Sequence, residues 1–599
     1  MHSTQAGEPI SQRPLRLWPG VAVVALQWLL RFVVPVFVPA AIAIGYIAGL
    51  AGGLAVMVWW AFFSRAPKVE RWGGIGLMIV AIAGATRIID KSIATGMMGM
   101  MFFLHVTPVL SLAFVVWAVA TRRLADGPRR AWMVAAVLAA CLGWAPLRTS
   151  GITGDGASQF VWRWEKTPEE RLVALAEVKP AVAAEERREN PPVAAAVEKA
   201  PAVAAAPVGV EKAAEWPGFR GPNRDGVMGG VRVETNWAVA RPAELWRRPV
   251  GPGWSSFAVR GDLFYTQEQR GPDEVVACYR TSTGEPVWMH RDAARFWESN
   301  AGAGPRGTPT LSGGRVYTFG ATGIVNALNA ADGAVIWTRN AGADTGVKIP
   351  DWGFASSPLV VGDLVVVAAS GVLVAYDRAT GAQRWLGPGG GSGYSSPHLA
   401  TLGGVAQVLL LNGGGVLSVA PSDGKMLWEH KWKGDGIVQP GFAADGDVLI
   451  GTGSGIGSES GLRRIAVTHG AGAWSTEARW TTAGLKPYYN DFVVYDGHAY
   501  GFDGSLLACV DLQDGKRQWK GGRYGHGQLV LLREQGLLLV LSEEGELALV
   551  KAEAGQFTEV ARIPALKGKT WNHPVLAGDR LLVRNGEEMA AFRVTLAGR

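Results

Sequence analysis

The chain shows two different patterns of apolar and polar residues. In roughly the first 150 residues, long apolar stretches alternate with short basic segments. After about residue 215, apolar and polar residues alternate over short runs separated by glycine-rich turns. Long apolar runs are typical of membrane helices, and short alternating runs are typical of β-strands. The pattern predicts an α-helical membrane bundle followed by an all-β domain.

The apolar stretches predict about five membrane spans, each near the ~20 residues needed to cross a hydrocarbon core. The third and fifth are the shortest. Arg31 in the first stretch is costly unless it faces other helices or reaches the interface. A cleavable signal peptide is the competing interpretation of this stretch, but a long apolar tail would remain after cleavage near Ala40. The stretches are Leu17–Pro39, Ala40–Phe63, Trp72–Ile89, Met97–Ala120 and Ala131–Leu147.

The basic residues predict the orientation of this bundle. They gather before the first stretch, between the second and third, and between the fourth and fifth, which places them all on one side. Basic loops favour the cytoplasm. We therefore expect residues 1–16 to be cytoplasmic, 17–147 to form the bundle in a bacterial inner membrane, and everything after Arg148 to lie in the periplasm. No nucleic-acid partner is predicted, because much of the +7 net charge belongs to these loops. His105, alone in the fourth stretch, predicts a packed or interfacial imidazole.

Residues 148–214 are predicted to be a periplasmic linker. From about Arg171 to Ala214 the composition narrows to Ala, Val, Pro, Glu and Lys, with few aromatics and no strand-like alternation. This composition is typical of a semi-extended, disordered tether. A short helix is expected around Glu169–Val178.

A short motif recurs in the second half of the chain. A Gly stands four residues before a Trp, and a Thr or Asp precedes the Gly. The Thr/Asp–Gly pair suits a tight turn, and the Trp suits docking against a neighbouring sheet. The first four Trp residues are 49, 48 and 43 positions apart, a period typical of β-propeller blades with four strands each. The copies are RTSTGEPVW (Arg280–Trp288), NAADGAVIW (Asn329–Trp337), DRATGAQRW (Asp377–Trp385), APSDGKMLW (Ala420–Trp428) and DLQDGKRQW (Asp511–Trp519).

These copies resemble the tryptophan-docking motif of the PQQ-like (pyrroloquinoline quinone repeat) β-propeller family, and WPGFRGPNRDG (Trp216–Gly226) resembles the start of its membrane-associated members. The resemblance covers roughly residues 215–599, and counting the complete and degenerate repeats predicts an eight-bladed propeller. Blades five and seven have lost parts of the motif. Blade eight is expected to combine three C-terminal strands with an N-terminal strand carrying Trp246, which closes the ring. The family includes both quinoprotein dehydrogenases and pure scaffolds.

Candidate binding residues are expected at the channel mouth, where loops enter each innermost strand. Aligning these entries gives one polar ring: Ser256, Thr308, Ser357, Ser396, Gln439, Asp491, His526 and His573. Such side chains commonly satisfy backbone groups at strand entries. Asp491, His526 and His573, on consecutive blades, are also candidate metal ligands. A second ring, two positions earlier, contains Trp254, Arg306, Ala355, Tyr394, Ile437, Tyr489, Tyr524 and Trp571. Its Arg306 and aromatics could hold an anion or a flat ligand.

Three function classes follow. The first is a membrane-anchored periplasmic module that binds or scaffolds a protein partner, a glycan or another envelope component, without catalytic residues. The alternative is a membrane-bound dehydrogenase that uses PQQ with calcium and passes electrons to quinone. PQQ alcohol dehydrogenases typically carry adjacent cysteines, whereas Cys141, Cys278 and Cys509 are far apart. A transporter or sensor is the third class, and the scarcity of intramembrane charge argues against transport.

Overall fold

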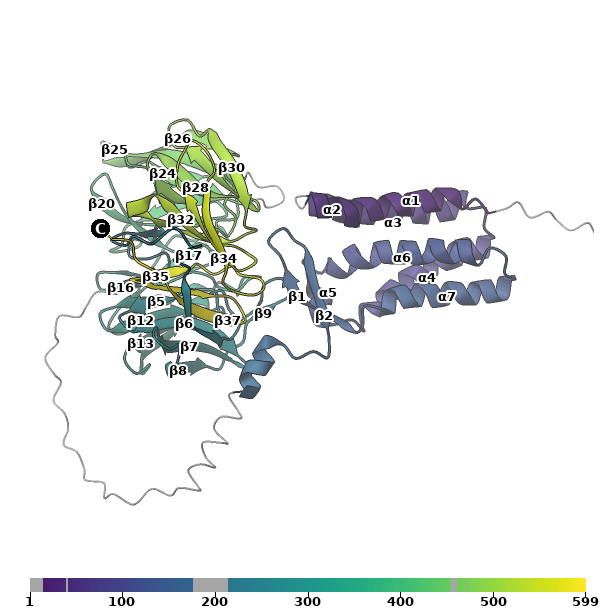
Figure 1. The fold of residues 1–599 in the computed structure, drawn as a ribbon, viewed down its shortest axis with the longest axis horizontal. Helices are drawn as coiled ribbons and strands as arrows, with labels where there is room; N and C mark the ends of the chain where they lie inside the picture. The colour runs from purple at the N-terminus through teal and green to yellow at the C-terminus, as the bar shows by residue number, and fades with distance from the viewer. Residues whose placement is uncertain (1–14, 39–40, 176–213, 454–459, 471, 599) are drawn as a thin grey trace, which may run out of the picture. The chain divides into compact units, whose positions relative to one another are not determined.

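The computed structural model describes residues 15–38, 41–175, 214–453, 460–470 and 472–598. The chain divides into two compact units (Figure 1). The first comprises Met1–Glu165 with Glu298–Ala301, and the second comprises Lys166–Trp297 with Gly302–Arg599. Each unit is described by itself.

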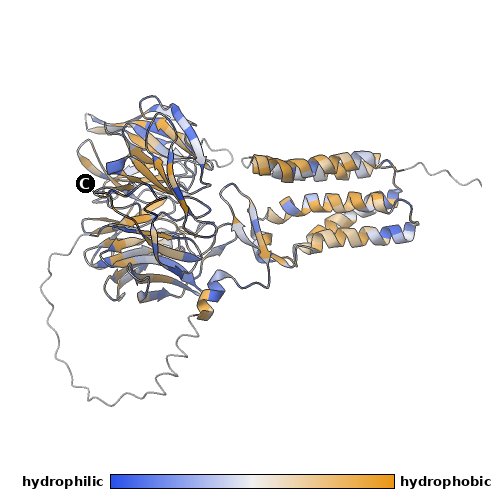
Figure 2. Ribbon diagram, in the orientation of Figure 1, coloured by the Kyte–Doolittle hydropathy of each residue, from blue (hydrophilic) through white to orange (hydrophobic). Residues whose placement is uncertain are grey.

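The first unit is a helical bundle, and its helices are apolar along most of their length (Figure 2). Trp60 is fully buried, edge-on to Phe114 and Trp117 with ring centroids 4.9 and 5.5 Å away. The helical segments are α1 (Trp18–Trp28), the π-helical turn η1 (Leu29–Val33), α2 (Val34–Phe37), α3 (Ile42–Val58), the π-helical turn η3 (Trp59–Phe63), α4 (Lys68–Ala85), α5 (Lys91–Thr95), α6 (Met101–Ala120) and α7 (Asp126–Leu142).

Three segments among the described residues are long and apolar enough to cross a membrane: Trp18–Phe37, Ile42–Phe63 and Met101–Ala120. The prediction of about five spans is corrected accordingly. Helices α4 and α7 do form, but α4 begins with the charged sequence KVER and α7 has 17 residues beginning with DGPRR. Their apolar parts are therefore shorter than those of the three long segments, although α4 and α7 lie alongside α6 in the bundle (Figure 1). Glu70 of α4 and Arg129 of α7 form a buried ion pair of 3.3 Å.

Arg31 faces other helices, as its position in an apolar stretch requires. Its guanidinium stacks on Tyr46 of α3, 4.1 Å from the ring centroid, and lies 3.2 Å from Nε2 of His105 on α6. His105 Nδ1 lies 2.8 Å from the Met101 carbonyl oxygen. An Nδ1–H that donates to this carbonyl leaves Nε2 able to accept from Arg31. The imidazole is packed, as predicted, and its charged partner is a finding of the structure.

A β-hairpin follows α7 directly and caps the bundle. Its strands are β1 (Leu147–Ile152) and β2 (Ser158–Trp162). The Thr149 N–H donates to Ser92 Oγ at 2.9 Å, and Tyr46 Oη donates to the Gly156 carbonyl at 3.0 Å. The first part of the predicted linker is therefore ordered structure that belongs to the bundle.

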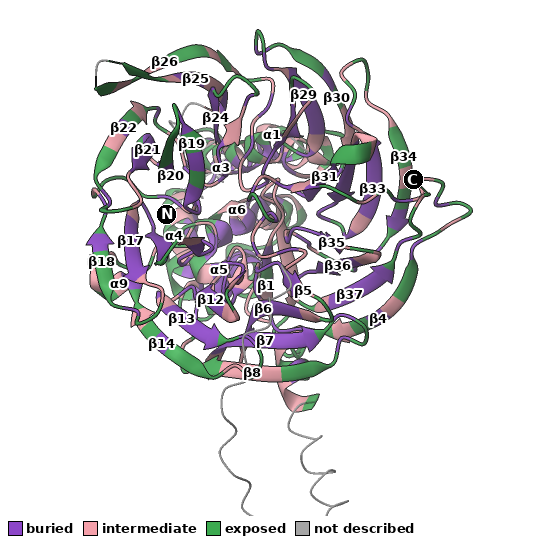
Figure 3. Cartoon of the chain, turned by 90° about the vertical axis from the view of Figure 1, so that its left-hand side faces the viewer, coloured by how far each residue is buried: buried purple, intermediate pink, exposed green. Residues whose placement is uncertain are grey.

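The second unit is a ring of eight sheets around a central axis (Figure 3). The outer strands are more exposed than the inner ones, because each inner strand packs between two neighbouring blades. Blades one to three are β5 (Ala258–Arg260), β6 (Leu263–Arg270), β7 (Asp273–Arg280) and β8 (Pro286–Asp292); β11 (Thr310–Ser312), β12 (Arg315–Phe319), β13 (Ile324–Asn329) and β14 (Val335–Asn340); and β15 (Leu359–Val361), β16 (Leu364–Ala369), β17 (Val372–Asp377) and β18 (Gln383–Leu386).

Blades four to six continue the same four-stranded antiparallel pattern. In blade five, which has lost part of the motif, the two outer strands pair over a long antiparallel register from Leu462 and Thr482 to Gly470 and Ala473. The strands are β19 (His398–Leu402), β20 (Val405–Asn412), β21 (Gly415–Val419) and β22 (Met426–Lys431); β23 (Gly441–Phe442), β24 (Val448–Thr452), β25 (Gly461–Gly470) and β26 (Ala473–Thr482); and β27 (Val493–Tyr495), β28 (His498–Asp503), β29 (Leu506–Asp511) and β30 (Arg517–Arg523).

The last two blades recruit strands from the start of the domain. Blade seven is β31 (Gln528–Leu532), β32 (Leu537–Leu541), β33 (Glu546–Lys551) and β34 (Glu559–Pro564), with β3 (Val227–Met228) parallel to β31. Blade eight is β35 (Val575–Ala577), β36 (Arg580–Arg584), β37 (Glu588–Arg593) and β4 (Ala243–Pro249). Trp246 of β4 pairs with Ala591, which confirms the predicted closure of an eight-bladed ring. Short elements in the connections are β9 (Trp297–Glu298), β10 (Gly302–Ala303), α9 (Ala341–Thr345) and the 3₁₀ turn η4 (Arg533–Gln535).

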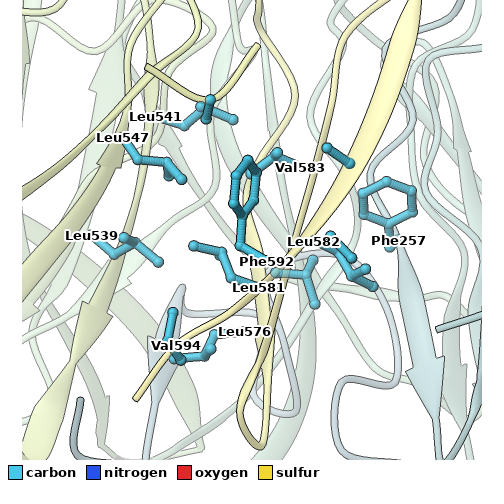
Figure 4. Packing of buried hydrophobic residues seen from close by; sticks show 14 of the residues in the cluster. Phe257, Leu539, Leu541, Leu547, Leu576, Leu581, Leu582, Val583, Phe592 and Val594 are labelled. Carbon is cyan, nitrogen blue, oxygen red and sulfur yellow. The ribbon is translucent and has the colours of Figure 1, made fainter. Parts of the chain in front are cut away.

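Apolar side chains fill the spaces between blades. Figure 4 shows those of blades seven, eight and one, where Leu539 and Leu547 face Phe592 and Leu581. Phe257 extends the same cluster into blade one. Because each sheet is covered by its neighbours on both faces, its inner strands are almost continuously buried.

The predicted tether falls largely on residues 176–213, which lie outside the described residues. Before it, residues 168–175 are helical, in agreement with the expected short helix. Glu169 anchors this segment to blade one: Arg295 donates to both carboxylate oxygens, at 2.7 and 2.9 Å, and the Gly271 N–H donates at 2.9 Å. After it, the Gly261 N–H donates to Glu215, so residues on both sides of 176–213 belong to the propeller unit.

Candidate functional site

The repeated motif joins each blade to the next. In DRATGAQRW, Asp377 Oδ1 accepts hydrogen bonds from the Ala379 and Thr380 N–H groups, which folds the turn. Gly381 follows with φ of 74°, in the region that favours glycine. A Cβ at this position would lie 2.7 Å from the ring of Trp337, the docking Trp of the preceding blade. The turn is therefore the receptor for a neighbouring indole.

The same reciprocal contact recurs around the ring. Each of these docking indoles donates its N–H to a backbone carbonyl in the turn of the following blade. The bonds are Trp246 to Thr281 (2.8 Å), Trp288 to Ala330 (3.1 Å), Trp337 to Arg378 (3.1 Å), Trp385 to Pro421 (2.8 Å), Trp480 to Leu512 (2.9 Å) and Trp519 to Glu553 (2.7 Å).

Trp428 departs from this pattern for a reason visible in the sequence. Blade five lacks the motif turn that would receive it, and its indole N–H instead donates to Gln407 of its own blade at 2.7 Å. The motif therefore serves to dock neighbouring blades, and the candidate binding site lies elsewhere in the ring.

The first predicted ring forms a hydrogen-bonded belt around the channel. The side chain of one blade accepts from the backbone N–H of the preceding blade, which is the structural role expected of polar residues at strand entries. The links run from Ser256 to Thr308, from Thr308 to Ser357 and from Ser357 to Ser396, each at 2.9 Å, and from Gln439 to Asp491 at 2.7 Å. With its amide oxygen turned toward Ser396, Gln439 accepts from that N–H at 3.0 Å.

The belt closes differently on the other side of the ring. Ser256 Oγ donates to the His573 carbonyl at 2.7 Å, and His573 Nε2 lies 3.4 Å from Asp491. Gln528 spans the gap, because its amide donates to the Tyr489 carbonyl at 3.1 Å and to the Trp571 carbonyl at 3.2 Å. His526 stacks on Tyr489 with ring centroids 5.5 Å apart.

A segment from the start of the domain fills the channel next to the belt. We call Trp216–Gly226 the plug. It pairs with blade one through Trp216 and Val259, and its Pro217 carbonyl accepts from Leu311 of blade two. Phe219 packs edge-on against His573 of blade eight. A single short segment thus contacts blades on different sides of the ring.

Two buried arginines fix the plug in place. Arg220 donates to the Phe492 carbonyl at 2.6 Å and lies 3.5 Å from Asp491. Arg224 donates to the Ser357 and Pro358 carbonyls at 3.0 and 2.8 Å, using both terminal nitrogens. A planar guanidinium suits this forked arrangement, which an ammonium cannot reproduce. The plug therefore joins blade six to blade three across the channel.

The electrostatics of the channel follow from this burial. Burial and the nearby Arg220 lower the pKa of Arg224 to about 9. Burial opposes ionisation of Asp491, but Arg220, His573 and the Gln439 N–H more than offset it and hold the pKa below its ordinary value. Burial lowers the pKa of His398 to about 3 and, despite Asp491, also lowers that of His573. Asp491 is thus the buried anion that pairs with Arg220 of the plug.

The second predicted ring supplies aromatic side chains to the channel mouth. Trp254 and Trp571 are 4.8 Å apart, and Trp571 and Tyr489 are 4.9 Å apart. Lys569 lies over Trp571 at 4.5 Å. Tyr394 stacks on Trp352 at 5.0 Å. We call Trp254, Trp352, Tyr394, Tyr488, Tyr489 and Trp571 the aromatic mouth.

Tyr488 connects the two sides of the aromatic mouth. It lies 5.0 Å from Tyr489 and 6.3 Å from Trp352, so the rings form a continuous row from blade eight through blade six to blade three. All six side chains are partly exposed. Arg306 stands apart from this row, over Phe296 at 4.8 Å, and donates to the Gly302 and Gly304 carbonyls.

The sequence alone does not identify Arg220, Arg224, Gln528, Trp352 or Tyr488 as residues of the channel. WPGFRGPNRDG resembles the start of related proteins, but nothing in it specifies which blades it contacts. Trp352 falls three residues before the aligned Ala355, and Tyr488 falls one residue before the aligned Tyr489. The sequence feature that could have identified both residues is the row of aromatic residues in the strand-entry loops.

The channel residues do not fit PQQ with calcium, the group that the repeat is named after. Asp491 is the carboxylate of the belt, and its oxygens are occupied by the Gln439 N–H, Arg220 and His573. Within the described part of the chain, no group of three His, Cys, Asp or Glu side chains could hold a metal ion. The channel beside the belt is occupied by the buried guanidinium groups of the plug. Each of the three cysteines is a free, buried thiol.

An eight-bladed propeller closed by tryptophan docking defines the protein as a PQQ-type repeat propeller. The chain belongs to the family described as outer membrane protein assembly factor BamB, whose model matches residues 235–388, 273–520 and 412–597. It is 24% identical to the outer membrane protein assembly factor BamB of Yersinia pestis over 57% of this chain and 86% of that protein. It is 26% identical to that of Shewanella oneidensis over 58% and 87%. Among solved structures it is similar to a quinohemoprotein alcohol dehydrogenase from Comamonas testosteroni, with 12% identity, a TM-score of 0.46, and coverage of 64% and 81%.

Proposed function

We propose that this protein is a propeller anchored in the bacterial inner membrane, which binds or scaffolds an envelope protein in the periplasm. The observation that best supports this proposal is that different residues of the ring have different roles. The belt and the plug use their polar groups to hold the blades together, which leaves the aromatic mouth as a partly exposed surface. Partly exposed tryptophan and tyrosine are the residue types enriched in protein interfaces.

The relatives support the same proposal. They are named as assembly factors for outer membrane proteins, and the matched region is the propeller. The three apolar segments support the anchoring, and the basic loops support a cytoplasmic N-terminus with the propeller outside. A glycan is the alternative occupant of the same aromatic surface.

Site-specific photocrosslinking in intact cells tests this proposal. A crosslinking amino acid at Tyr394 should trap an envelope protein, because this side chain belongs to the aromatic mouth. Val405 provides a matched control: it lies in the same blade, 37% exposed, at the opposite end of β19 and β20. No product at Tyr394, or equal products at both positions, would contradict the proposal.

The dehydrogenase alternative has a direct test as well. Purified protein is titrated with PQQ and calcium while absorbance and melting temperature are followed. The occupied channel predicts no saturable change in either signal. A saturable shift accompanied by dye-linked oxidation of an alcohol or sugar would establish the alternative.

A further inference from the structure

The hairpin that caps the helical bundle carries two exposed tryptophans. Trp162 ends β2 and is 47% exposed, and Trp164 is 69% exposed. Their rings are stacked, with centroids 4.9 Å apart and an interplanar angle of 11°. Exposed stacked indoles are unusual on a surface that faces only water, because they leave a large apolar area unburied.

The strand geometry shows which way Trp162 faces. Alternate residues of a strand lie on the same face, so Ser158, Phe160 and Trp162 share one side of β2. Ser158 Oγ lies 3.4 Å from Tyr46 Oη of α3, and Phe160 is edge-on to His105 of α6 at 5.0 Å. This face of the hairpin therefore looks toward the ends of the helices.

Trp162 lies on the same face of β2, two residues beyond Phe160. It pairs with Leu147, the first residue of β1, just after α7 ends. Phe160 is enclosed by His105 and by Trp144, which is 5.4 Å away, whereas Trp162 has Trp164 as its ring partner. In a bilayer, the ends of apolar helices lie at the depth of the lipid headgroups.

We infer that Trp162 and Trp164 lie in the lipid headgroup region and anchor the hairpin at the outer surface of the membrane. Tryptophan is enriched at this depth because its ring is apolar and its N–H bonds to headgroups or water. Two basic residues of the hairpin, the exposed Arg163 and the partly exposed Arg148, complement anionic lipid phosphates. Arg163 is also paired with Asp90 at 3.2 Å, which fixes the hairpin to the loop before α5.

This inference rests on the proposed membrane anchoring, and one experiment separates the two. The full chain, with its three native cysteines replaced by alanine, is reconstituted in nanodiscs that contain anionic lipid. Single cysteines are introduced as W162C, W164C, Q159C and V116C and labelled with nitroxide. Collision with oxygen, which concentrates in lipid, and with a water-soluble nickel complex then reports the depth of each label. Gln159 lies on the opposite face of β2, and Val116 lies 54% exposed within α6.

Labels at positions 162 and 164 should report headgroup depth, the label at 159 should report water, and the label at 116 should report the hydrocarbon core. Water-like values at 162 and 164 with a lipid-like value at 116 would overturn the inference and leave the anchoring intact. A water-like value at 116 would overturn the anchoring itself.

Hydroxyl-radical footprinting of the unsubstituted protein gives a second measurement that needs no variant. Trp162 and Trp164 should oxidise several-fold more slowly in nanodiscs than in amphipol, which lacks headgroups. Equal oxidation rates in the two preparations would contradict the inference.

Discussion

Gly381 shows how much of the ring depends on single positions. It provides both the positive φ of the turn and the space for the indole of Trp337. Sequence spacing is sufficient to predict this role, because the Gly and the Trp belong to one local motif. The belt residues are also predictable, since aligned strand entries place equivalent residues at equivalent positions of a symmetric ring.

Replacing Gly381 with Ala should destabilise the propeller by about 2–4 kcal/mol, the sum of the left-handed backbone strain and a clash in a packed contact. Guanidinium unfolding of the full chain in detergent, followed by tryptophan fluorescence, measures the change. Gly578→Ala is the matched control, because Gly578 has a φ of 60° but no atom within 4 Å of the place its Cβ would take. Equal losses in the two variants would show that the indole contact contributes nothing.

Asp491 makes the stability of the propeller sensitive to acid. Its pKa in the folded protein is below the ordinary value, so it contributes stability at neutral pH that is lost as pH falls from about 4 through the lower folded pKa. Burial of His573 lowers its pKa too, which adds a loss of stability that begins at a higher pH, because the unfolded state binds a proton near about pH 6.5.

Asp491→Asn should remove the contribution of the Asp491 carboxylate to stability and leave Arg220 as a buried charge without its anion. The expected loss at neutral pH is about 3–5 kcal/mol. Unfolding free energies measured at intervals from neutral pH down to about pH 3 should show a shallower acid dependence in the variant than in the wild type. Parallel curves for the two proteins would show that Asp491 is not the titrating group.

At the scale of elements, the plug is the main feature that the sequence does not place. Its residues form no periodic pattern, and its partners are spread over blades one, two, three, six and eight. The same difficulty applies to Arg31 and His105, which meet across two helices. The number of long apolar helices is overestimated for a different reason: the stretches Trp72–Ile89 and Ala131–Leu147 run past Ala85 and Leu142, where α4 and α7 end.

Arg224→Lys tests whether the plug stabilises the ring. Lysine keeps the charge but cannot donate to the Ser357 and Pro358 carbonyls together, so we expect a loss of about 1–3 kcal/mol. Arg232→Lys is the control, since Arg232 is exposed and donates to the Glu534 carbonyl at the surface. Thermal unfolding of the full chain measures both. A wild-type melting temperature for Arg224→Lys would argue against a stabilising plug.

At the scale of the whole molecule, the membrane topology of the chain can be measured. The positive-inside rule predicts that the propeller lies outside the cytoplasm. Alkaline phosphatase fused after Arg599 should be active. Green fluorescent protein fused at the same position and exported by the general secretory route should not fluoresce. The opposite result for both reporters would place the propeller in the cytoplasm and remove the basis for an envelope partner.

The closure of blade eight has a consequence for the order in which the protein is made. Strand β4 is synthesised before any complete blade, and its partner β37 is among the last residues of the domain. Until β37 arrives, β4 has an unpaired edge that can pair with other chains. Contacts between residues so distant in sequence form slowly. The emerging chain therefore needs protection from aggregation until its synthesis is complete, and any truncation that removes β37 leaves the ring open.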